Sequence, residues 1–311
     1  MFENIHKLIG EHSTIIIHRH KNPDGDALGA QIGLKKILSD TYPEKKIYAT
    51  GDMTPRYAFM ISEPMDEIPD SMYEGALAIL LDSSAKSLIS DDRYTLAHAT
   101  ARIDHHIFVE KMADVEVGDT SFESCCGMIA AMAMECGYTV SKEAAKALYT
   151  GMITDSGRFR YDSTTAQTFR LASFLMEREF DTSDIYRNLY ADDLSMIQLR
   201  AKYTLKIKTT KEGVAYIYTP IDEAKEYGVD NFTLSRGMVN VMSEIRGIHS
   251  WVNFTETESG VLCEIRSNRY NINPIATKYG GGGHQKASGA TLKDKDEAMA
   301  LLSDLKNLRE E

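Results

Sequence analysis

The sequence lacks the features that mark secreted, membrane-spanning and disulfide-built proteins. Its 311 residues include only four cysteines, which follow no regular spacing. This argues against a disulfide framework and against a zinc ribbon. No apolar run approaches the length of a membrane-spanning helix, so none is predicted. Residues 1–12 carry acidic side chains and no apolar core segment, so they do not resemble a signal peptide, and we expect a cytoplasmic protein.

Blocks of basic residues are also missing. The formal net charge is −11, with 35 Lys and Arg against 46 Asp and Glu. Proteins that clamp long duplex DNA present a basic stripe, so long duplex DNA is not expected as a partner. An anionic substrate must be held locally, by metal ions and a few Arg, Lys and His side chains. This favours a short RNA, a dinucleotide or a nucleotide bisphosphate as substrate, and no membrane partner is expected.

What the chain does contain is a set of acidic and imidazole side chains directly after an apolar run. The run Thr14–Ile17 is followed by a short Pro/Gly loop that carries His20, Asp24 and Asp26, and then by a helix-forming segment at 27–38. Strand, acidic loop and helix form one βα unit. In open α/β sheets, ligands bind at the outer end of such a strand.

Three further segments also place an aspartate at the end of an element. Residues 76–81 lead into Asp82, residues 100–103 into Asp104-His105-His106, and residues 147–153 into Asp155. A single terminal Asp is usually a cap or a turn former. Four of them, two beside histidines, predict a metal site instead. The mixed donors suit Mn²⁺, with Mg²⁺ or Co²⁺ as substitutes, better than a thiolate-bound metal. Two ions roughly 3.5–4 Å apart explain the inventory better than one and serve phosphoester hydrolysis.

These segments resemble a known family. HKNPDGDA, LDSS, IDHH and GMITDSGRF resemble, in order, the four motifs of the DHH phosphoesterases. The run GGGGH at 280–284, followed by QKASG, resembles the DHHA1 domain of the same proteins. The resemblance spans almost the whole chain. The layout is similar to the nano-RNase/pAp-phosphatase branch, which is related to RecJ exonucleases and cyclic-di-AMP phosphodiesterases.

The resemblance implies roles for individual residues. The metal ligands would be His20 and Asp24 for one Mn²⁺, Asp26 and His105 for the other, Asp82 between them, and Asp155 mainly for the second ion. His106 would face the scissile phosphate, and Asp104 would orient the histidine pair. The substrate-binding residues would be Arg266, Ser267, Gly282, Gly283 and His284. Arg158, close to Asp155, either contacts phosphate or faces solvent.

The glycine run supports a binding role by its own chemistry. Four consecutive glycines lose much backbone entropy on folding, so packing alone explains them poorly. Backbone N–H groups that point into a concavity can hold an anion, and His284 adds a side-chain donor. A flexible linker is the alternative, but a predicted helix precedes the run and no Ser-rich sequence surrounds it.

The expected architecture is α/β. Residues 1–190 alternate apolar strands with helices, which predicts a doubly wound parallel sheet. Residues 191–204 are expected to form a helical connector, and residues 205–311 a smaller α/β domain with a mixed sheet. Helices are predicted at 122–136 and 232–245, with Cys125 and Cys126 as a packed helix start, and a hairpin turn at 258–260. A homodimer through the first domain is one option for the oligomeric state.

The sequence leaves four candidate functions to compare. The first is a two-metal phosphoesterase that acts on nano-RNA, pApA or pAp. The second is a direct cyclic-di-AMP phosphodiesterase, and a RecJ-like single-strand exonuclease is a further enzymatic reading. A family II-type pyrophosphatase would carry a basic signature that this chain lacks. A non-catalytic nucleotide sensor would have lost ligand positions, whereas all of them are present here.

Overall fold

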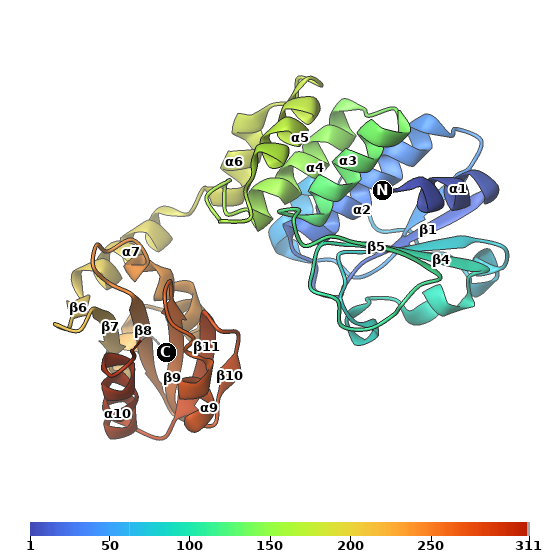
Figure 1. Cartoon of the computed structure of the whole chain (residues 1–311). Helices are drawn as coiled ribbons and strands as arrows, with labels where there is room; N and C mark the ends of the chain where they lie inside the picture. Colours follow the sequence, from blue (N-terminus) through green and yellow to red (C-terminus); the bar gives the residue numbers. More distant parts are fainter. Residues whose placement is uncertain (62, 310–311) are drawn as a thin grey trace. The chain divides into compact units, whose positions relative to one another are not determined.

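The computed structural model describes residues 1–61 and 63–309, which form two compact α/β units (Figure 1). The first unit is Met1–Ala191, and the second begins at Asp192. Helix α7 (Leu194–Leu205), which covers most of the predicted connector, buries Leu199 and Tyr203 in a core cluster of the second unit. No helix among these described residues has the length and apolar character needed to cross a bilayer.

The first unit is built on a five-stranded, all-parallel sheet in the order β2-β1-β3-β4-β5. This confirms the predicted α/β class with a parallel sheet. The strands are β1 (Thr14–His18), β2 (Lys46–Ala49), β3 (Leu77–Leu81), β4 (Ala99–Asp104) and β5 (Val115–Gly118).

Side chains that alternate along β1 and β3 cover both faces of this sheet. Ile15 and Ile17 face a large core cluster that also contains side chains of α1 to α6, and four of these helices, α2 to α5, lie over the same face in Figure 1. Ile16 faces the opposite side, where it packs with Tyr73. The helices are α1 (Glu3–Glu11), α2 (Gly25–Thr41), α3 (Cys125–Cys136), α4 (Lys142–Asp155), α5 (Ala166–Met176) and α6 (Thr182–Tyr190). The opposite face is covered by short 3₁₀ turns, η2 (Asp70–Tyr73) and η4 (Asp92–Leu96) among them.

Helices α2 and α4 approach each other closely because glycines face the contact. A Cβ atom on Gly29 would lie 2.7 Å from the carbonyl oxygen of Ala147. A Cβ atom on Gly151 would lie 2.2 Å from Cys126 Sγ and 3.0 Å from the carbonyl oxygen of Gly25. Any larger residue would push the two helices apart.

The second unit is a mixed six-stranded sheet in the order β10-β11-β9-β8-β7-β6, in which only the β7–β8 pair is parallel among the described strands. This confirms the predicted smaller α/β domain with a mixed sheet. The strands are β6 (Lys208–Thr209), β7 (Val214–Thr219), β8 (Ser250–Thr257), β9 (Gly260–Ser267), β10 (Gly282–Gly283) and β11 (Ala287–Leu292). The predicted hairpin turn joins β8 to β9. Helices α9 (Asn273–Lys278) and α10 (Lys295–Lys306) contribute to one core cluster, and α7 and α8 (Ile221–Glu226) to another.

One predicted helix of this unit is wrong. Residues 232–245 form a π turn at Thr233–Gly237 and then a 3₁₀ turn at Val239–Met242. The side-chain amide of Asn253 donates hydrogen bonds of 2.7 Å to the carbonyl oxygens of Leu234 and Ser235. These carbonyls are therefore drawn toward β8, and a regular helix is interrupted where a side chain enters its hydrogen-bond ladder.

Candidate metal centre

The candidate site lies where the strand order of the first sheet reverses. Strand β1 has β2 on one side and β3 on the other, and ligands bind at such a switch point outside the carboxyl ends of the strands. His20 follows β1, Asp82 follows β3, and His105 follows β4. Asp26 lies in the first turn of α2, and Asp155 is the last residue of α4.

One group of donors contains His20, Asp24 and Asp82. The Nε2 atom of His20 is 3.5 Å from Asp82 Oδ2 and 3.9 Å from Asp24 Oδ1. One candidate ligand atom from each of the three residues lies within 4.8 Å of the others. Asp24 is the N-cap of α2, where its Oδ1 accepts hydrogen bonds from the N–H groups of Asp26 and Ala27. The cap holds the carboxylate at this end of the helix.

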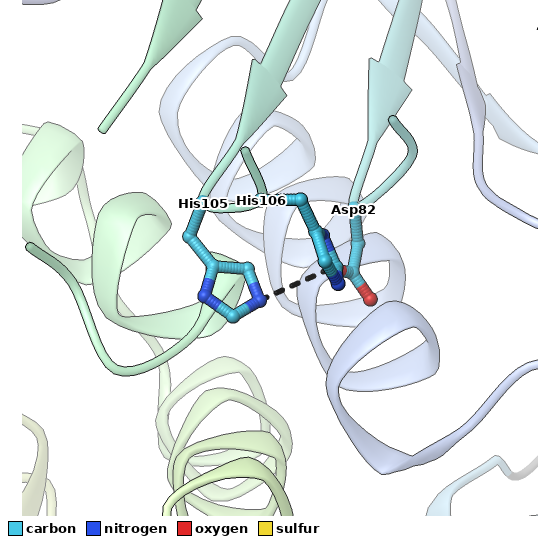
Figure 2. Close-up of side chains that lie close together, drawn as sticks. All are labelled: Asp82, His105 and His106. Carbon is cyan, nitrogen blue, oxygen red and sulfur yellow. Dashed lines mark ion pairs between the residues drawn. The ribbon is translucent and has the colours of Figure 1, made fainter. Parts of the chain in front are cut away.

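A second group contains Asp26, His105 and Asp155. The Nε2 atom of His105 is 3.4 Å from Asp155 Oδ2, 3.7 Å from Asp26 Oδ2 and 3.5 Å from Asp82 Oδ1. Asp82 therefore faces His20 with one oxygen and His105 with the other. Figure 2 shows Asp82 beside the two adjacent imidazoles of His105 and His106. The structure thus brings all six predicted ligands into two neighbouring groups joined by Asp82.

The buried oxygen of Asp82 gives a test of whether a cation fits here. Its Oδ1 atom is buried and has no hydrogen-bond partner among the described residues. Its nearest basic neighbours are the imidazole nitrogens of His105 and His106, each 3.5 Å away, so the buried oxygen needs either a protonated imidazole or a bound cation beside it. The donor set of imidazoles and carboxylates suits divalent cations. The residues present therefore fit one ion in each group, with Asp82 between them.

Two backbone N–H groups hold Asp26 in place. Its carboxylate accepts hydrogen bonds of 2.7 Å from Cys125 N and 2.8 Å from Cys126 N, in the first turn of α3. Both cysteines are fully buried, which confirms the predicted packed helix start. Helix α3 begins three residues later than predicted, because Ser124 caps it with a hydrogen bond to Gly127 N. Cys125 and Cys126 thus position a candidate ligand through their backbone.

His106 is held differently from its neighbour His105. Its Nδ1 atom lies 2.8 Å from Oδ1 of the buried Asp104. The other Asp104 oxygen accepts a hydrogen bond from the buried Arg102, whose Nε donates to the Ser83 carbonyl at 2.7 Å. The hydrogen bond to Asp104 raises the pKa of His106 above its ordinary value. Asp104 therefore fixes the orientation of the His106 ring through Nδ1. The other ring nitrogen, Nε2, makes no bond to Asp104.

The carboxylates dominate the electrostatics of the cluster. Burial lowers the pKa of His20 and His105, but contacts with the surrounding carboxylates outweigh it and raise both values to about 10. Burial, together with the charges of neighbouring aspartates, raises the pKa of Asp155 to about 6. Burial likewise raises the pKa of Asp26 well above its ordinary value. A cluster that attracts protons this strongly attracts divalent cations for the same reason.

Arg19, which was not predicted as a site residue, supports the first group. This fully buried guanidinium donates to the carbonyl of His20 at 3.0 Å and to Asp52 Oδ1 at 3.2 Å. Asp52 also accepts a hydrogen bond of 2.7 Å from Asn22 N, so both ends of the 20–22 loop are tied to one carboxylate. The signal was an arginine at the end of an apolar run, since a fully buried arginine needs a partner.

Arg158 lies in an unusual backbone segment directly after Asp155 and Ser156. Gly157, Arg158 and Phe159 have φ values of 57°, 64° and 61°, all in the left-handed region. Non-glycine residues rarely adopt this conformation, and it is often found at functional sites. The Arg158 guanidinium lies 3.8 Å from the centroid of the Tyr190 ring. The side chain is exposed, and its guanidinium is held against this aromatic ring.

The predicted substrate-binding residues of the second unit lie around β9, β10 and β11. The hydroxyl of Ser267 is used inside the unit, since it donates to the His249 carbonyl and accepts from Arg269 N and Tyr270 N. Arg266 donates to Glu264 at 3.0 Å and lines up with Ala287 across the β9–β11 pair.

The glycine run is an ordered hairpin and not a flexible linker. Gly282 and Gly283 form β10, which pairs with Gly289 and Ser288 of β11. Gly283 has a φ of 135°, and a Cβ atom there would lie 2.6 Å from the Ala287 carbonyl, so the position requires glycine. His284 follows at the tip and is exposed.

Comparisons with known proteins agree with this architecture. Residues 14–152 match the DHH family, N-terminal domain, and residues 213–311 match the DHHA1 domain. The chain is 35% identical to the bifunctional oligoribonuclease and PAP phosphatase NrnA of Bacillus subtilis, over 98% of this chain and 97% of that protein. It is 33% identical to the probable bifunctional oligoribonuclease and PAP phosphatase NrnA of Streptococcus mutans, over 99% and 98% of the two chains.

Two more distant matches bear on the fold and on a second possible substrate. An exopolyphosphatase-related protein from Bacteroides fragilis superimposes with a TM-score of 0.83 at 24% identity, covering 98% of this chain and 95% of that one, which shows a common fold. The cyclic-di-AMP phosphodiesterase GdpP of Geobacillus thermodenitrificans is 26% identical over 93% of this chain but only 46% of its own length.

Together, the parallel sheet with a His/Asp centre at its switch point and the separate mixed-sheet unit define a two-domain α/β protein of the phosphoesterase class. The chain belongs to the DHH/DHHA1 phosphoesterase family, in its nano-RNase/pAp-phosphatase branch.

Proposed function

We propose that the protein is a two-metal, Mn²⁺-dependent phosphoesterase that hydrolyses short nucleotide substrates such as nano-RNA, pApA and pAp. The observation that carries the proposal is Asp82, whose two oxygens face two separate groups of ligand atoms. The relatives named oligoribonuclease and PAP phosphatase, which match the chain over nearly its full length, support the substrate class.

Each group of side chains has its own part in this proposal. His20 and Asp24 would hold one ion, Asp26, His105 and Asp155 the other, and Asp82 would contact both. Bound ions would lower the pKa of the attacking water and screen the charge on the phosphoryl oxygens. His106, fixed through Nδ1 by Asp104, is free to donate a hydrogen bond from Nε2 to a phosphoryl oxygen or to the leaving oxygen.

The substrate would also be held away from the metal ligands. Arg266 and the hairpin of Gly282, Gly283 and His284 are proposed to grip a terminal phosphate or base, with Ser267 maintaining the turn beside them. Arg158 is proposed to contact phosphate, because its strained backbone and its stacking on Tyr190 hold an exposed guanidinium close in sequence to the ligand Asp155. This local grip suits a chain with a net charge of −11.

Direct hydrolysis of cyclic-di-AMP is the second candidate, because a phosphodiesterase of that name matches most of the chain. We place it second, since its identity of 26% is lower and that protein is about twice as long as the matched part.

The test is a product analysis. Protein freed of metal with EDTA would be supplied with Mn²⁺, Mg²⁺ or Co²⁺ and offered pAp, pApA, cyclic-di-AMP and a short RNA oligonucleotide. We expect mononucleotides from the linear substrates, with Mn²⁺ giving the highest rate. Hydrolysis that persists in EDTA, or turnover of cyclic-di-AMP alone, would contradict the proposal.

A further inference from the structure

Three large apolar side chains next to His106 have no place in the core. Ile107, Phe108 and Val109 are 79%, 63% and 63% exposed, and they lie in the loop between β4 and β5. A run of exposed apolar residues usually marks a binding surface. Here it begins one residue after the histidine that we place against the scissile phosphate.

One of the three, Phe108, lines a pocket that none of the metal ligands lines. The pocket has a volume of about 420 Å³ and is lined by Phe108, His106 and Arg102, and by Glu116 and Asp119 from β5 and the segment after it. A volume of this size is within the usual range for small-molecule sites. His106 thus has the metal group on one side and this pocket, which we call the base pocket, on another.

Arg102 gives the base pocket a hydrogen-bond donor that the protein does not use. The residue is only 2% exposed, and its Nε and Nη2 atoms are bonded to Ser83 and Asp104. Within residues 1–61 and 63–309, its Nη1 atom has no hydrogen-bond partner. This nitrogen is not among the fully buried atoms that lack a partner, so it is accessible at the wall of the pocket and can donate to a ligand that carries an acceptor.

The charge of the base pocket indicates an uncharged ligand. Arg102 is already paired with Asp104, and the pocket adds the carboxylates of Glu116 and Asp119. The imidazole of His106 is the other basic group of the lining, so two carboxylates offset it and the pocket has no excess of positive charge for a phosphate. Each carboxylate uses one oxygen for backbone N–H groups, Glu116 for Met112 and Ala113 and Asp119 for Ser121, and retains a second oxygen as an acceptor. A flat, uncharged ligand with both acceptor and donor groups meets these conditions.

We propose that the base pocket binds one nucleobase of the substrate. Phe108 stacks on the face of the base, Arg102 Nη1 donates to a carbonyl oxygen at its edge, and Asp119 accepts from an amino group. Guanine and cytosine carry both a carbonyl and an amino group, whereas adenine lacks the carbonyl and uracil lacks the amino group. The proposal deepens the proposed function and rests on it for the assignment of the bound molecule as a substrate.

The first test is equilibrium binding of the four ribonucleoside monophosphates, which does not depend on turnover. Stacking of a base on an aromatic ring corresponds to about 5- to 150-fold in affinity, so Phe108→Ala should weaken GMP and CMP binding by at least fivefold. Phe108→Tyr should bind as the wild type does. Ile107→Ala is the matched control, because Ile107 is more exposed and does not line the pocket. Unchanged GMP affinity in Phe108→Ala would overturn the proposal.

The second test uses hydrolysis of dinucleotides. Removing the base from one ribose of pGpG should raise KM for the wild type, and Phe108→Ala should add no further loss on that abasic substrate. An equal loss on the complete and abasic substrates would overturn the base pocket. If the wild type hydrolyses no dinucleotide, the proposed function fails. In that case, GMP binding by Phe108→Ala alone decides whether the base pocket exists.

A third variant tests the edge contact. Asp119→Asn keeps the oxygen that accepts from Ser121 N and removes the charge, so the preference for GMP and CMP over AMP and UMP should narrow. If the wild type shows no such preference, the assignment of Arg102 and Asp119 to the base edge is wrong. If Phe108→Ala changes the oligomeric state in light scattering but not nucleotide binding, the apolar run is an interface between copies and the proposal fails.

Discussion

Asp82 lies 3.5 Å from His20 through its Oδ2 atom and 3.5 Å from His105 through its Oδ1 atom. These two imidazoles belong to different ligand groups, so one carboxylate at the end of β3 joins them. The carboxylate is 2% exposed, and its Oδ1 has no hydrogen-bond donor among the described residues. We therefore expect the proposed metal centre to depend on Asp82 more than on a candidate ligand that belongs to one group only.

Replacing Asp82 should disable both halves of the centre at once. We expect Asp82→Asn to lower the bound metal in both groups and to lower kcat/KM by about 100-fold or more, because the bridging charge is lost. Elemental analysis of the purified variant measures the first effect and an assay on short RNA the second. Asp70→Asn, which removes an exposed carboxylate paired with Arg93, is the control and should change neither. Full metal content in Asp82→Asn would contradict the shared-ligand arrangement.

The two neighbouring histidines should give opposite results. His105→Gln should lose metal from the second group, because its Nε2 faces three carboxylates. His106→Gln should retain metal and lower kcat by about 100-fold, the usual effect of a lost proton donor. The readouts are elemental analysis and steady-state kinetics on the same preparations. Equal metal loss in both variants would remove the distinction drawn between them.

Metal binding should release protons. Because the pKa of His20 and of His105 is raised to about 10 by the surrounding carboxylates, both imidazoles carry a proton near pH 7.5 in EDTA-treated protein. Both must lose it to bind a metal, and Asp26, whose pKa is also raised, can add to the number, so we expect at least two protons released as Mn²⁺ fills the two groups. Calorimetric titrations in two buffers with different ionisation enthalpies measure this number. His105→Gln should release about one proton fewer, and release near zero in the wild type would refute the expectation.

Stability should fall in moderate acid because of His18, which is buried at the end of β1. Burial lowers the pKa of this imidazole from 6.5 to about 4. Between pH 4 and 6.5, His18 therefore binds a proton in the unfolded chain but stays neutral in the folded chain. The free energy of unfolding therefore falls as the pH decreases from 6.5 to 4, by about 3 kcal/mol at most for this group.

Urea unfolding of EDTA-treated protein at several pH values measures this slope. His18→Gln should flatten it relative to the wild type. Taking the difference between the two proteins cancels the contribution of His20 and His105, whose raised pKa values act in the opposite direction between pH 6.5 and 10. An identical slope in both proteins would show that His18 is not the cause.

The glycine–histidine hairpin should affect substrate binding but not metal binding. His284→Ala should raise KM for short RNA several-fold, since it removes an exposed donor from the tip after β10, while metal content stays at the wild-type level. Lys278→Ala, which removes the ion pair between the last residue of α9 and Asp304 of α10, is a control on the same unit. An unchanged KM would count against the clamp.

The sequence predicted the part of the site that follows from the ends of parallel strands. The apolar runs before His20, Asp82 and His105 became β1, β3 and β4, and the geometry of the sheet brought their ends together. The strands β2 and β5 were not predicted, because their short sequences, KIYA and VEVG, mix polar and apolar residues on the two edges of the sheet.

Contacts made through the backbone or by distant partners could not be predicted. The hold on Asp26 comes from the N–H groups of Cys125 and Cys126, which any residue type would provide. The π turn at Thr233–Gly237 depends on Asn253, which is distant in sequence. The pairing of Arg102 with Asp104 was missed because the charge of an arginine in a strand gives no sign of burial.

The close contact between α2 and α4 sets the distance between two candidate metal ligands. Asp26 comes from the first of these helices and Asp155 from the second, and bare glycine at positions 29 and 151 lets the two backbones touch. One added methyl group at position 151 would widen the spacing between the two carboxylates. A substitution at position 151 would therefore change the size of cation that the proposed site prefers, although Gly151 is not itself a proposed ligand.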